Sequence, residues 1–314
     1  MNSTITILKV IRKILINNIL NLLFFIFALV FVVVLKKNIV TEPQIIFLDI
    51  GQGDAILIQQ DNYQILVDGG PDDSIMYELP KFMPWFDKKI EKLVLTHPHD
   101  DHILGLLILL KKYEIKEILY SKVKYPNLAY DYLKNNYQEI LHDVKAGYSF
   151  SYNDIFFSVL YPFDREYKQE ENLNNESLVI FLHINGYKIL LMGDAEVGVE
   201  ERLLDYNILN GIDILKVGHH CSRSSTSEKF LSFTQPEVAI CLCGEGNRFG
   251  HPHYETLEKL KDEKLPTYFF NWKGIQEKDS NEAIVNGSLK MDDIEKRIMP
   301  WNYEAKVMRE LELI

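Results

Sequence analysis

The sequence predicts an α/β (α+β) protein in which two β-sheets pack face to face, helices cover the outer faces, and one transmembrane helix precedes them. Short runs rich in Ile, Leu and Val alternate with Gly, Asn and Asp turns, and the second half of the chain repeats this pattern with helical segments added. An uncharged apolar stretch lies near the N-terminus. With 314 residues, 47% of them hydrophobic, the chain has ample apolar material for a core.

The N-terminal stretch predicts a membrane anchor. Residues 14–35 read ILINNILNLLFFIFALVFVVVL, which is about the 20 residues that a helix needs to cross the hydrocarbon core. A cleaved signal peptide is the alternative, but its apolar core would be shorter and no A-x-A pattern follows. We therefore expect a single-pass protein of the cell membrane, with an anchor over 1–36 that contacts lipid through residues 14–35, and a tether over 37–43. The flanking Lys and Arg residues weakly favour an extracytoplasmic catalytic domain.

The main domain, expected over residues 44–291, begins with three short strands at 45–50, 54–59 and 63–68, joined by tight turns. A helical or irregular connection leads to a strand at 91–96. An apolar helix at 102–113 and a strand at 115–120 follow.

Later segments repeat this design. Apolar strands are expected at 154–162, 177–184, 187–194, 212–220, 237–243 and 267–272. Asn185-Gly186 predicts a hairpin turn. Helices are expected at 195–206, at 254–261, and after the capping serines and threonine of 224–227. Residues 292–314 predict a peripheral helical tail.

The charge and the cysteine content of the chain limit the classes of function and of binding site that the sequence supports. The net charge of −11 and pI near 5.4 exclude a uniformly basic nucleic-acid-binding surface, although a local basic groove remains compatible. The three cysteines, Cys221, Cys241 and Cys243, form no even framework and no C-x-x-C. We expect them to be small buried hydrophobic residues rather than a disulfide or a metal site.

The stretch THPHDDHILG, residues 96–105, crowds metal-capable side chains into one turn. His97 and His99 are two residues apart in an extended turn, so both can face one ion. Asp101 and His102 follow as the chain enters a helix and can face a second ion. Imidazole and carboxylate are ligands that both Zn²⁺ and Mn²⁺ accept. A plain polar loop is the alternative, but the position between an apolar strand and an apolar helix favours metal binding.

Further ligand-type residues follow other predicted strands. Asp194 comes just after an apolar strand, where a carboxylate could bridge two cations. The remaining candidates are two histidine pairs, His219 with His220 and His251 with His253. Together with the histidines of residues 96–105, they place seven of the nine histidines in three strand-to-helix turns.

These motifs resemble the metallo-β-lactamase superfamily and, more narrowly, the C-terminal hydrolase domain of the ComEC family of DNA-uptake proteins. The resemblance runs from about residue 43 to 291 through FLDIGQGDAILIQ, ILVDGG, VLTHPHDDHILG, ILLMGDAE, LKVGHHCS and NRFGHPH. It implies an αββα four-layer sandwich with two divalent ions, expected to be Zn²⁺ with Mn²⁺ as the alternative. The implied ligands are His97 and His99 for one ion, Asp101, His102 and one histidine of the 219–220 pair for the other, and Asp194 between them. His220 is the favoured ligand of that pair, although the sequence does not separate it from His219.

The chain also departs from the family pattern. His99 stands where ComEC-type domains often have aspartate, and Cys221 where glycine is usual. His142 and His183 are the candidates for a further ligand on the first ion, and both are better explained as structural. The channel of ComEC proteins has many membrane helices, whereas this chain has one predicted span.

The implied function is a membrane-anchored, metal-dependent hydrolase. We expect a phosphodiesterase or nuclease acting on DNA through a hydroxide activated by two metals. The expected catalytic residues are Asp101, His219 as a neighbour contacting the substrate, and Asp49, which would orient a ligand histidine. The expected substrate-binding residues are Ser222, Arg223, Arg248, His251 and His253.

The acidic chain gains no general attraction to DNA. Hydrolysis of a cell-envelope phosphodiester, of phosphorylcholine or teichoic-acid type, is therefore one alternative. A non-catalytic accessory module of a DNA-uptake or envelope assembly is another.

Overall fold

The computed structural model describes residues 2–37, 40–163, 172–270, 282–285, 289–290 and 294. The chain divides into two compact units, Met1–Thr41 and Glu42–Ile314. The first contains helix α1 (Asn2–Lys37). Its segment Arg12–Val32 has 21 residues and a mean hydropathy of 2.4, which is long and apolar enough to cross a membrane. This helix is consistent with the predicted anchor, although a signal sequence near the N-terminus would have the same properties. The orientation of the anchor in the membrane stays a prediction.

The second unit contains a seven-stranded sheet with the order β15-β1-β2-β3-β4-β5-β6 among the described residues. Strands β2 and β3 form an antiparallel hairpin, whereas β3 to β6 run parallel. The strands are β1 (Val40–Phe47), β2 (Ile56–Asp61), β3 (Tyr63–Val67), β4 (Lys89–Leu95), β5 (Glu114–Tyr120), β6 (Leu141–Asp143) and β15 (Leu289–Lys290). Because β1 begins at Val40, most of the tether predicted over 37–43 belongs to a strand.

The second sheet has eight strands within the described ranges, in the order β14-β13-β12-β11-β10-β9-β8-β7. Strands β7 to β10 form an antiparallel meander, and β10 to β14 run parallel. The predicted hairpin between β9 and β10 is confirmed, with Asn185 at φ 51° and Gly186 at φ 82°. The strands are β7 (Ser149–Tyr152), β8 (Ile155–Tyr161), β9 (Val179–Ile184), β10 (Tyr187–Leu191), β11 (Ile214–Lys216), β12 (Val238–Cys241), β13 (Thr267–Phe270) and β14 (Glu282–Val285).

Helices connect the parallel strands. The α-helices of this unit are α2 (Ile75–Glu78), α3 (Asp100–Leu109), α4 (Leu128–Asn136), α5 (Val197–Leu203), α6 (Glu228–Thr234) and α7 (Tyr254–Asp262). Short 3₁₀ turns lie at η1 (Leu79–Lys81), η2 (Gln138–Ile140), η3 (Leu173–Glu176), η4 (Asn207–Leu209) and η5 (Gly218–Cys221). The predicted serine cap is confirmed at Ser227, whose hydroxyl accepts a hydrogen bond from the Phe230 amide at the start of α6.

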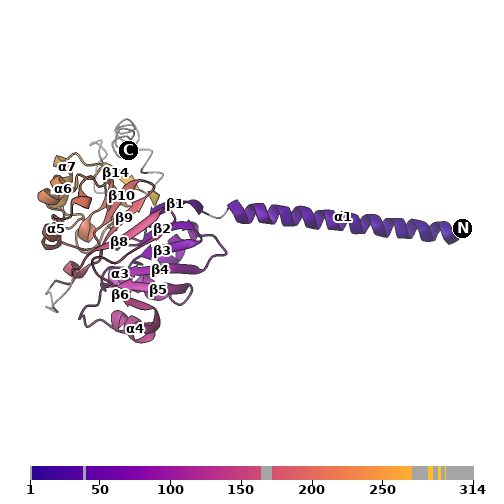
Figure 1. Ribbon diagram of the computed structural model, residues 1–314, viewed down its shortest axis with the longest axis horizontal. Coiled ribbons are helices and arrows are strands. Elements are labelled where there is room, and N and C mark those ends of the chain that lie inside the picture. Colours follow the sequence, from indigo (N-terminus) through magenta and orange to yellow (C-terminus); the bar gives the residue numbers. More distant parts are fainter. Residues whose placement is uncertain are drawn as a thin grey trace. The chain divides into compact units, whose positions relative to one another are not determined.

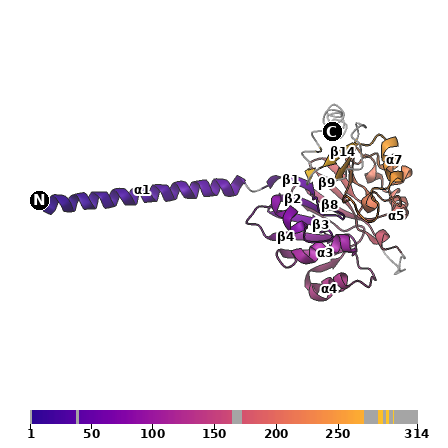
Figure 2. The ribbon, with the colours of Figure 1, turned by 180° about the vertical axis from the view of Figure 1, so that it is seen from behind.

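Side-chain alternation along the strands builds three hydrophobic layers. Ile45 and Phe47 pack between the sheets with residues such as Ile180 of β9. Ile46 faces the other way, toward the helices on the first sheet, and a third cluster lies under the helices on the second sheet. Figures 1 and 2 show α3 and α4 on one side of the paired sheets and α5, α6 and α7 on the other. The predicted αββα sandwich is confirmed.

The parallel strands end at one edge of each sheet, which brings the loops after them together. Helix α3 begins two residues earlier and ends four residues earlier than predicted, because Asp100 already lies in its first turn. Helix α4 and strands β6 and β7 lacked a recognised signal in the sequence. The predicted helical tail at 292–314 lies outside the described residues except for Ile294, which is buried.

Candidate metal centre

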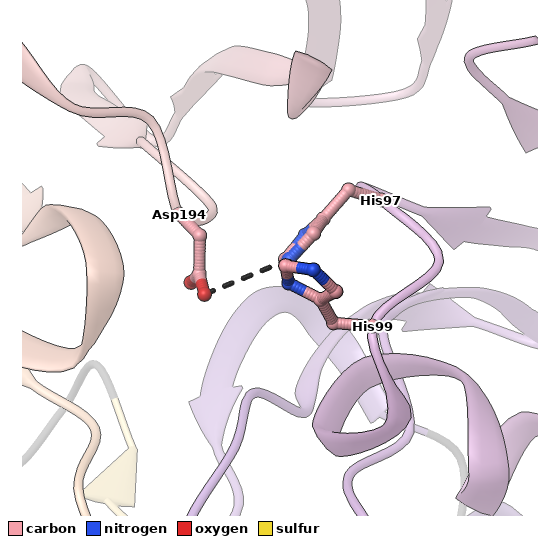
Figure 3. Close-up of side chains that lie close together, drawn as sticks. All are labelled: His97, His99 and Asp194. Atoms are coloured by element: carbon pink, nitrogen blue, oxygen red, sulfur yellow. Dashed lines mark hydrogen bonds and ion pairs between the residues drawn. The ribbon is translucent and has the colours of Figure 1, made fainter. Parts of the chain in front are cut away.

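The predicted histidine turn follows strand β4 and opens helix α3. His97 Nε2 lies 2.9 Å from His99 Nδ1, so both rings occupy the same side of the turn as expected. Asp194, from the loop after β10, approaches them, with its Oδ2 atom 3.6 Å from His97 Nε2. Figure 3 shows the two imidazoles directed toward this carboxylate. One possible ligand atom from each of these three residues lies within 4.8 Å of the others.

A second group lies beside the first. It combines Asp101 and His102 of α3 with His220 from the turn after β11. His220 Nε2 is 3.4 Å from Asp101 Oδ2 and 3.4 Å from Asp194 Oδ2. His102 Nε2 is also 3.4 Å from Asp194 Oδ2. The carboxylate of Asp194 therefore faces both groups, which is the geometry that a bridging ligand requires.

The two adjacent histidines after β11 point in different directions. His220 is buried and belongs to the group just described. His219 turns away, with its Nδ1 atom 3.1 Å from Glu196 Oε1 and 3.2 Å from the Ser224 hydroxyl. The geometry thus separates two residues that the sequence could not: His220 fits a ligand, and His219 fits a residue that contacts a substrate.

The donor set fits divalent cations. Within the described residues, three buried atoms of the two groups make no hydrogen bond: His102 Nε2, His220 Nε2 and Asp194 Oδ1. A buried polar atom without a partner is costly, and such atoms are rare unless they bind an ion or water. Imidazole nitrogens with carboxylate oxygens are donors that Zn²⁺ and Mn²⁺ accept. These residues therefore suit a pair of such ions.

A buried aspartate fixes the ring of His102. Asp68, in the loop after β3, lies with its Oδ2 atom 2.8 Å from His102 Nδ1. The same carboxylate accepts hydrogen bonds from the Thr96 amide at 2.8 Å and the Thr96 hydroxyl at 2.6 Å. Carboxylates in this position set the tautomer of a ligand histidine. Sequence reasoning missed Asp68 and expected this role of Asp49, for which it stays a prediction.

His220 is fixed by different partners. Its Nδ1 atom lies 2.9 Å from the Leu242 carbonyl oxygen and 3.3 Å from Asp54 Oδ1. Asp54 in turn forms an ion pair with Lys216, and the fully buried Lys216 ammonium donates to the Gly193 carbonyl at 2.8 Å. Lys216 thus ties the loop that carries Asp194 to the acidic floor of the site. Both Asp54 and Lys216 could have been noticed as charged residues beside buried strands.

The electrostatics of the cluster depend on these contacts. Burial opposes charge on His102 and His220, but the nearby carboxylates outweigh it and raise the pKa of both rings well above the ordinary value. Burial would raise the pKa of Asp194, yet His220, His102 and His97 hold it well below its usual range. Burial and the neighbouring His102 lower the pKa of His97. Without metal, protons on His102 and His220 would offset part of the negative charge of the carboxylates.

The turn that carries His220 has an unusual backbone. His219, His220 and Cys221 have φ values of 46°, 51° and 64°, in the left-handed region that costs a non-glycine residue roughly 1–2 kcal/mol. A disulfide joins Cys221 to Cys241 at the end of β12, with Cα atoms 5.8 Å apart. The prediction of three unpaired cysteines was therefore wrong for two of them, because the fold brings together residues 20 positions apart. Cys243 is free and buried, as predicted.

An open cleft of about 580 Å³ leads to the metal-capable groups. It is lined by Asp101, Asp194, His99, His219 and His220 together with Gln52, Pro71, Asp100, Tyr125, Asn174, Asn247, Arg248, Phe249 and His251. Two of the five predicted substrate-binding residues, Arg248 and His251, thus line the cleft. The other three do not: the Ser222 hydroxyl contacts Ser224, the Arg223 guanidinium contacts Glu255, and the His253 ring accepts from the Arg223 amide. Their role as substrate binders stays a prediction.

This chain is similar in sequence to several bacterial proteins. The protein named ComE operon protein 3 of Bacillus subtilis is 30% identical over 249 residues, which are 70% of this chain and 31% of that protein. Recombination protein 2 of Haemophilus influenzae is 34% identical over 251 residues, covering 77% of this chain and 30% of its own. The chain thus spans less than a third of the length of these relatives.

Solved structures support the fold alone. The E377D mutant of the CmlA beta-hydroxylase, a protein from Streptomyces venezuelae, has a TM-score of 0.50 and 13% identity, over 80% of this chain and 54% of its own. The family model described as the metallo-beta-lactamase superfamily matches residues 48–245, a range that holds both candidate metal groups. The chain belongs to the metallo-β-lactamase superfamily.

Proposed function

We propose that this protein is a membrane-anchored, metal-dependent phosphodiesterase that cleaves nucleic acid. One observation carries the proposal. Ligand-type atoms from the ends of β4, β10 and β11 and from helix α3 converge on the Asp194 carboxylate at the floor of an open cleft. Two divalent cations bound there would supply the Lewis acidity that makes water a nucleophile at neutral pH and would stabilise charge on the phosphoryl oxygens. Zn²⁺ or Mn²⁺ suits these ligands.

Two residues of the cleft have chemistry that fits the reaction. Asp101 lies beside the cleft and contacts His220, and although burial opposes it, that contact lowers the pKa of the Asp101 carboxyl. Asp101 is therefore ionised at neutral pH, the form in which a carboxylate binds a cation. His219, partly exposed and held by Glu196, can donate a hydrogen bond to a phosphoryl oxygen. These roles rest on the positions of the two side chains at the cleft.

The wall of the cleft favours a nucleotide. The Arg248 guanidinium lies 4.8 Å from the centre of the Phe249 ring, and this ring stacks on His251 with centroids 5.7 Å apart. Arg248 and Phe249 are exposed, and Tyr125 lines the same cleft. A base next to a phosphate can use both an aromatic face and a guanidinium. A choline headgroup is a cation, and Arg248 would repel it.

The names of the relatives support nucleic acid as the substrate. They include a recombination protein, a ComE operon protein and the competence protein ComA of Neisseria gonorrhoeae. The formal charge of −11 belongs to the whole chain and does not prevent a local contact between Arg248 and a phosphate. A DNA-uptake context therefore supports nucleic acid over an envelope phosphodiester.

The test is a substrate panel on the full chain in detergent, loaded with Mn²⁺ or with Zn²⁺. Single-stranded DNA, bis-p-nitrophenyl phosphate and p-nitrophenylphosphorylcholine are compared, using the wild type, Asp194→Asn and His183→Ala. His183 is an exposed histidine of β9 and serves as the matched control. We expect metal-dependent cleavage of DNA that Asp194→Asn abolishes and His183→Ala retains. Cleavage of the choline ester alone would favour the envelope alternative, and equal inactivity of all three proteins would favour a non-catalytic module.

The proposed location is the cell membrane with the catalytic domain outside the cytoplasm. A protease added to intact cells should remove a C-terminal tag while the N-terminal segment stays in the membrane fraction. A protected tag would place the domain in the cytoplasm instead.

A further inference from the structure

The Cys221–Cys241 bond lies beside the hydrogen bond that orients His220. Cys221 directly follows His220 in the chain, and Cys241 directly precedes Leu242, whose carbonyl oxygen lies 2.9 Å from His220 Nδ1. Both cysteines are fully buried. The covalent link and the hydrogen bond therefore join the same two segments, the turn after β11 and the end of β12.

The turn needs such a link. His219, His220 and Cys221 all have positive φ, a conformation that non-glycine residues adopt reluctantly. Backbone hydrogen bonds connect the turn to other segments: the His219 amide donates to Gly193, and the His253 amide donates to the Cys221 carbonyl. The Val217 amide, ahead of the left-handed residues, donates to the Ile240 carbonyl of β12 at 3.0 Å, but neither of the bonds made by His219 and Cys221 reaches β12. If the turn relaxed toward negative φ, the His220 ring would leave the Leu242 carbonyl and the Asp194 carboxylate.

We infer that the Cys221–Cys241 disulfide is a positioning element that holds His220 in the geometry required to bind a divalent cation. The inference rests on the metal site of the proposed function and is independent of the bond cleaved there. Opening the disulfide takes two electrons and two protons from a dithiol reductant, which becomes a cyclic disulfide and leaves two protein thiols. Opening it should therefore weaken metal binding.

The first measurement counts thiols. The metal-free full chain, unfolded without reductant, is treated with iodoacetamide and weighed by mass spectrometry. One added group, on Cys243, is the expected result, and two more should appear after reduction with dithiothreitol. Three added groups before reduction would overturn the inference, because no bond would then be present.

The second measurement is the affinity for Mn²⁺ alone, by calorimetry of the full chain in detergent. Cys221→Ala and Cys241→Ala should weaken the binding by about 10–100-fold, as loss of a group that orients a ligand does. Cys243→Ala is the matched control, since Cys243 is equally buried, lies just past the end of the same strand and forms no disulfide. This variant should change the Mn²⁺ affinity less than about threefold.

Cys221→Gly separates positioning from general stability. Glycine accepts a positive φ without strain, so this variant should bind Mn²⁺ more tightly than Cys221→Ala although both lack the disulfide. If neither alanine variant folds, the wild type reduced with dithiothreitol, alkylated and desalted replaces them, with the same weakening expected. Equal Mn²⁺ affinity for the bonded and unbonded forms would overturn the inference. Tight, disulfide-dependent Mn²⁺ binding without any hydrolysis would refute the proposed function and leave the inference standing.

Discussion

Replacing Asp68 by Asn tests whether the buried carboxylate behind His102 sets the chemistry of the site. In the wild type, Asp68 Oδ2 accepts from the Thr96 hydroxyl at 2.6 Å and faces His102 Nδ1 at 2.8 Å, while Oδ1 accepts from the Thr96 amide at 2.8 Å. An asparagine that keeps its oxygen on the Thr96 amide places its NH₂ group against His102 Nδ1. That nitrogen must then accept, so the proton of neutral His102 moves to Nε2, the atom that faces Asp194.

The magnitude follows from this change of tautomer. A protonated Nε2 cannot bind a cation, and loss of an orienting carboxylate typically weakens metal binding 10–100-fold, or about 1.4–2.7 kcal/mol. Calorimetric titration of the metal-free full chain with Mn²⁺ measures it directly. Asp131→Asn is the control, since Asp131 pairs with Lys134 at the protein surface.

Asp49→Asn is the competing variant, because the sequence suggested Asp49 for the same role. If Asp49→Asn weakened Mn²⁺ binding more than Asp68→Asn did, the reasoning from the Asp68 contacts would be refuted. If Asp68→Asn bound Mn²⁺ as tightly as the wild type, the tautomer argument would fail as well.

Three further predictions concern the site and its support. Because the folded pKa of His102 and His220 is raised, their stabilisation of the metal-free protein is fully present below the unfolded value near 6.5 and is lost as pH rises through the folded values. Mn²⁺ must displace these protons, so the rise in Tm on adding Mn²⁺ should grow from about pH 6 to about pH 8, and a flat profile would contradict the assignment. Phe249→Ala should lower kcat/KM for single-stranded DNA about tenfold, from a stacking energy of roughly 1–3 kcal/mol per base, and should leave cleavage of an abasic strand unchanged. Gly105→Ala should prevent stable folding, because its Cβ would meet a backbone carbonyl of the β3–α2 loop. Gly198→Ala, whose Cβ would only make an ordinary contact with the Asn175 side chain at 3.9 Å, should shift Tm by only a few degrees in thermal denaturation.

The fold and the ligand turn can be predicted well from the sequence because both depend on local pattern. Alternating apolar strands and an H-x-H-x-D-H turn are visible within a short window, so the positions of His97, His99 and His102 follow from residue order alone. Asp194 follows from the same logic, as a carboxylate directly after a buried strand. Asp68 has the same position after β3, and the pattern ILVDGG held the signal that was missed.

Contacts that depend on tertiary structure could not be predicted in this way. The choice between His219 and His220 is made by three left-handed residues, which direct one ring inward and the other toward Glu196. The pairing of Cys221 with Cys241 depends on the parallel register of β11 and β12. The spacing of residues along the chain predicts neither the choice between the two histidines nor the cysteine pairing.

The charges of the site favour the binding of cations. Four carboxylates lie in or beside the two candidate groups: Asp101 and Asp194 belong to them, and Asp54 and Asp68 lie next to them. Among the described residues, Lys216 is the one buried ammonium that contacts these carboxylates. Four negative charges less one positive charge leave three to be balanced in a region of low dielectric. Protons on His102 and His220 supply at most two charges, whereas two divalent ions would supply four and would leave the site able to accept a phosphate anion. The charge of these carboxylates thus affects metal binding, the binding of an anionic substrate and the pH dependence of the site. Removing any one of the carboxylates should therefore change the metal affinity, the substrate affinity and the pH dependence together.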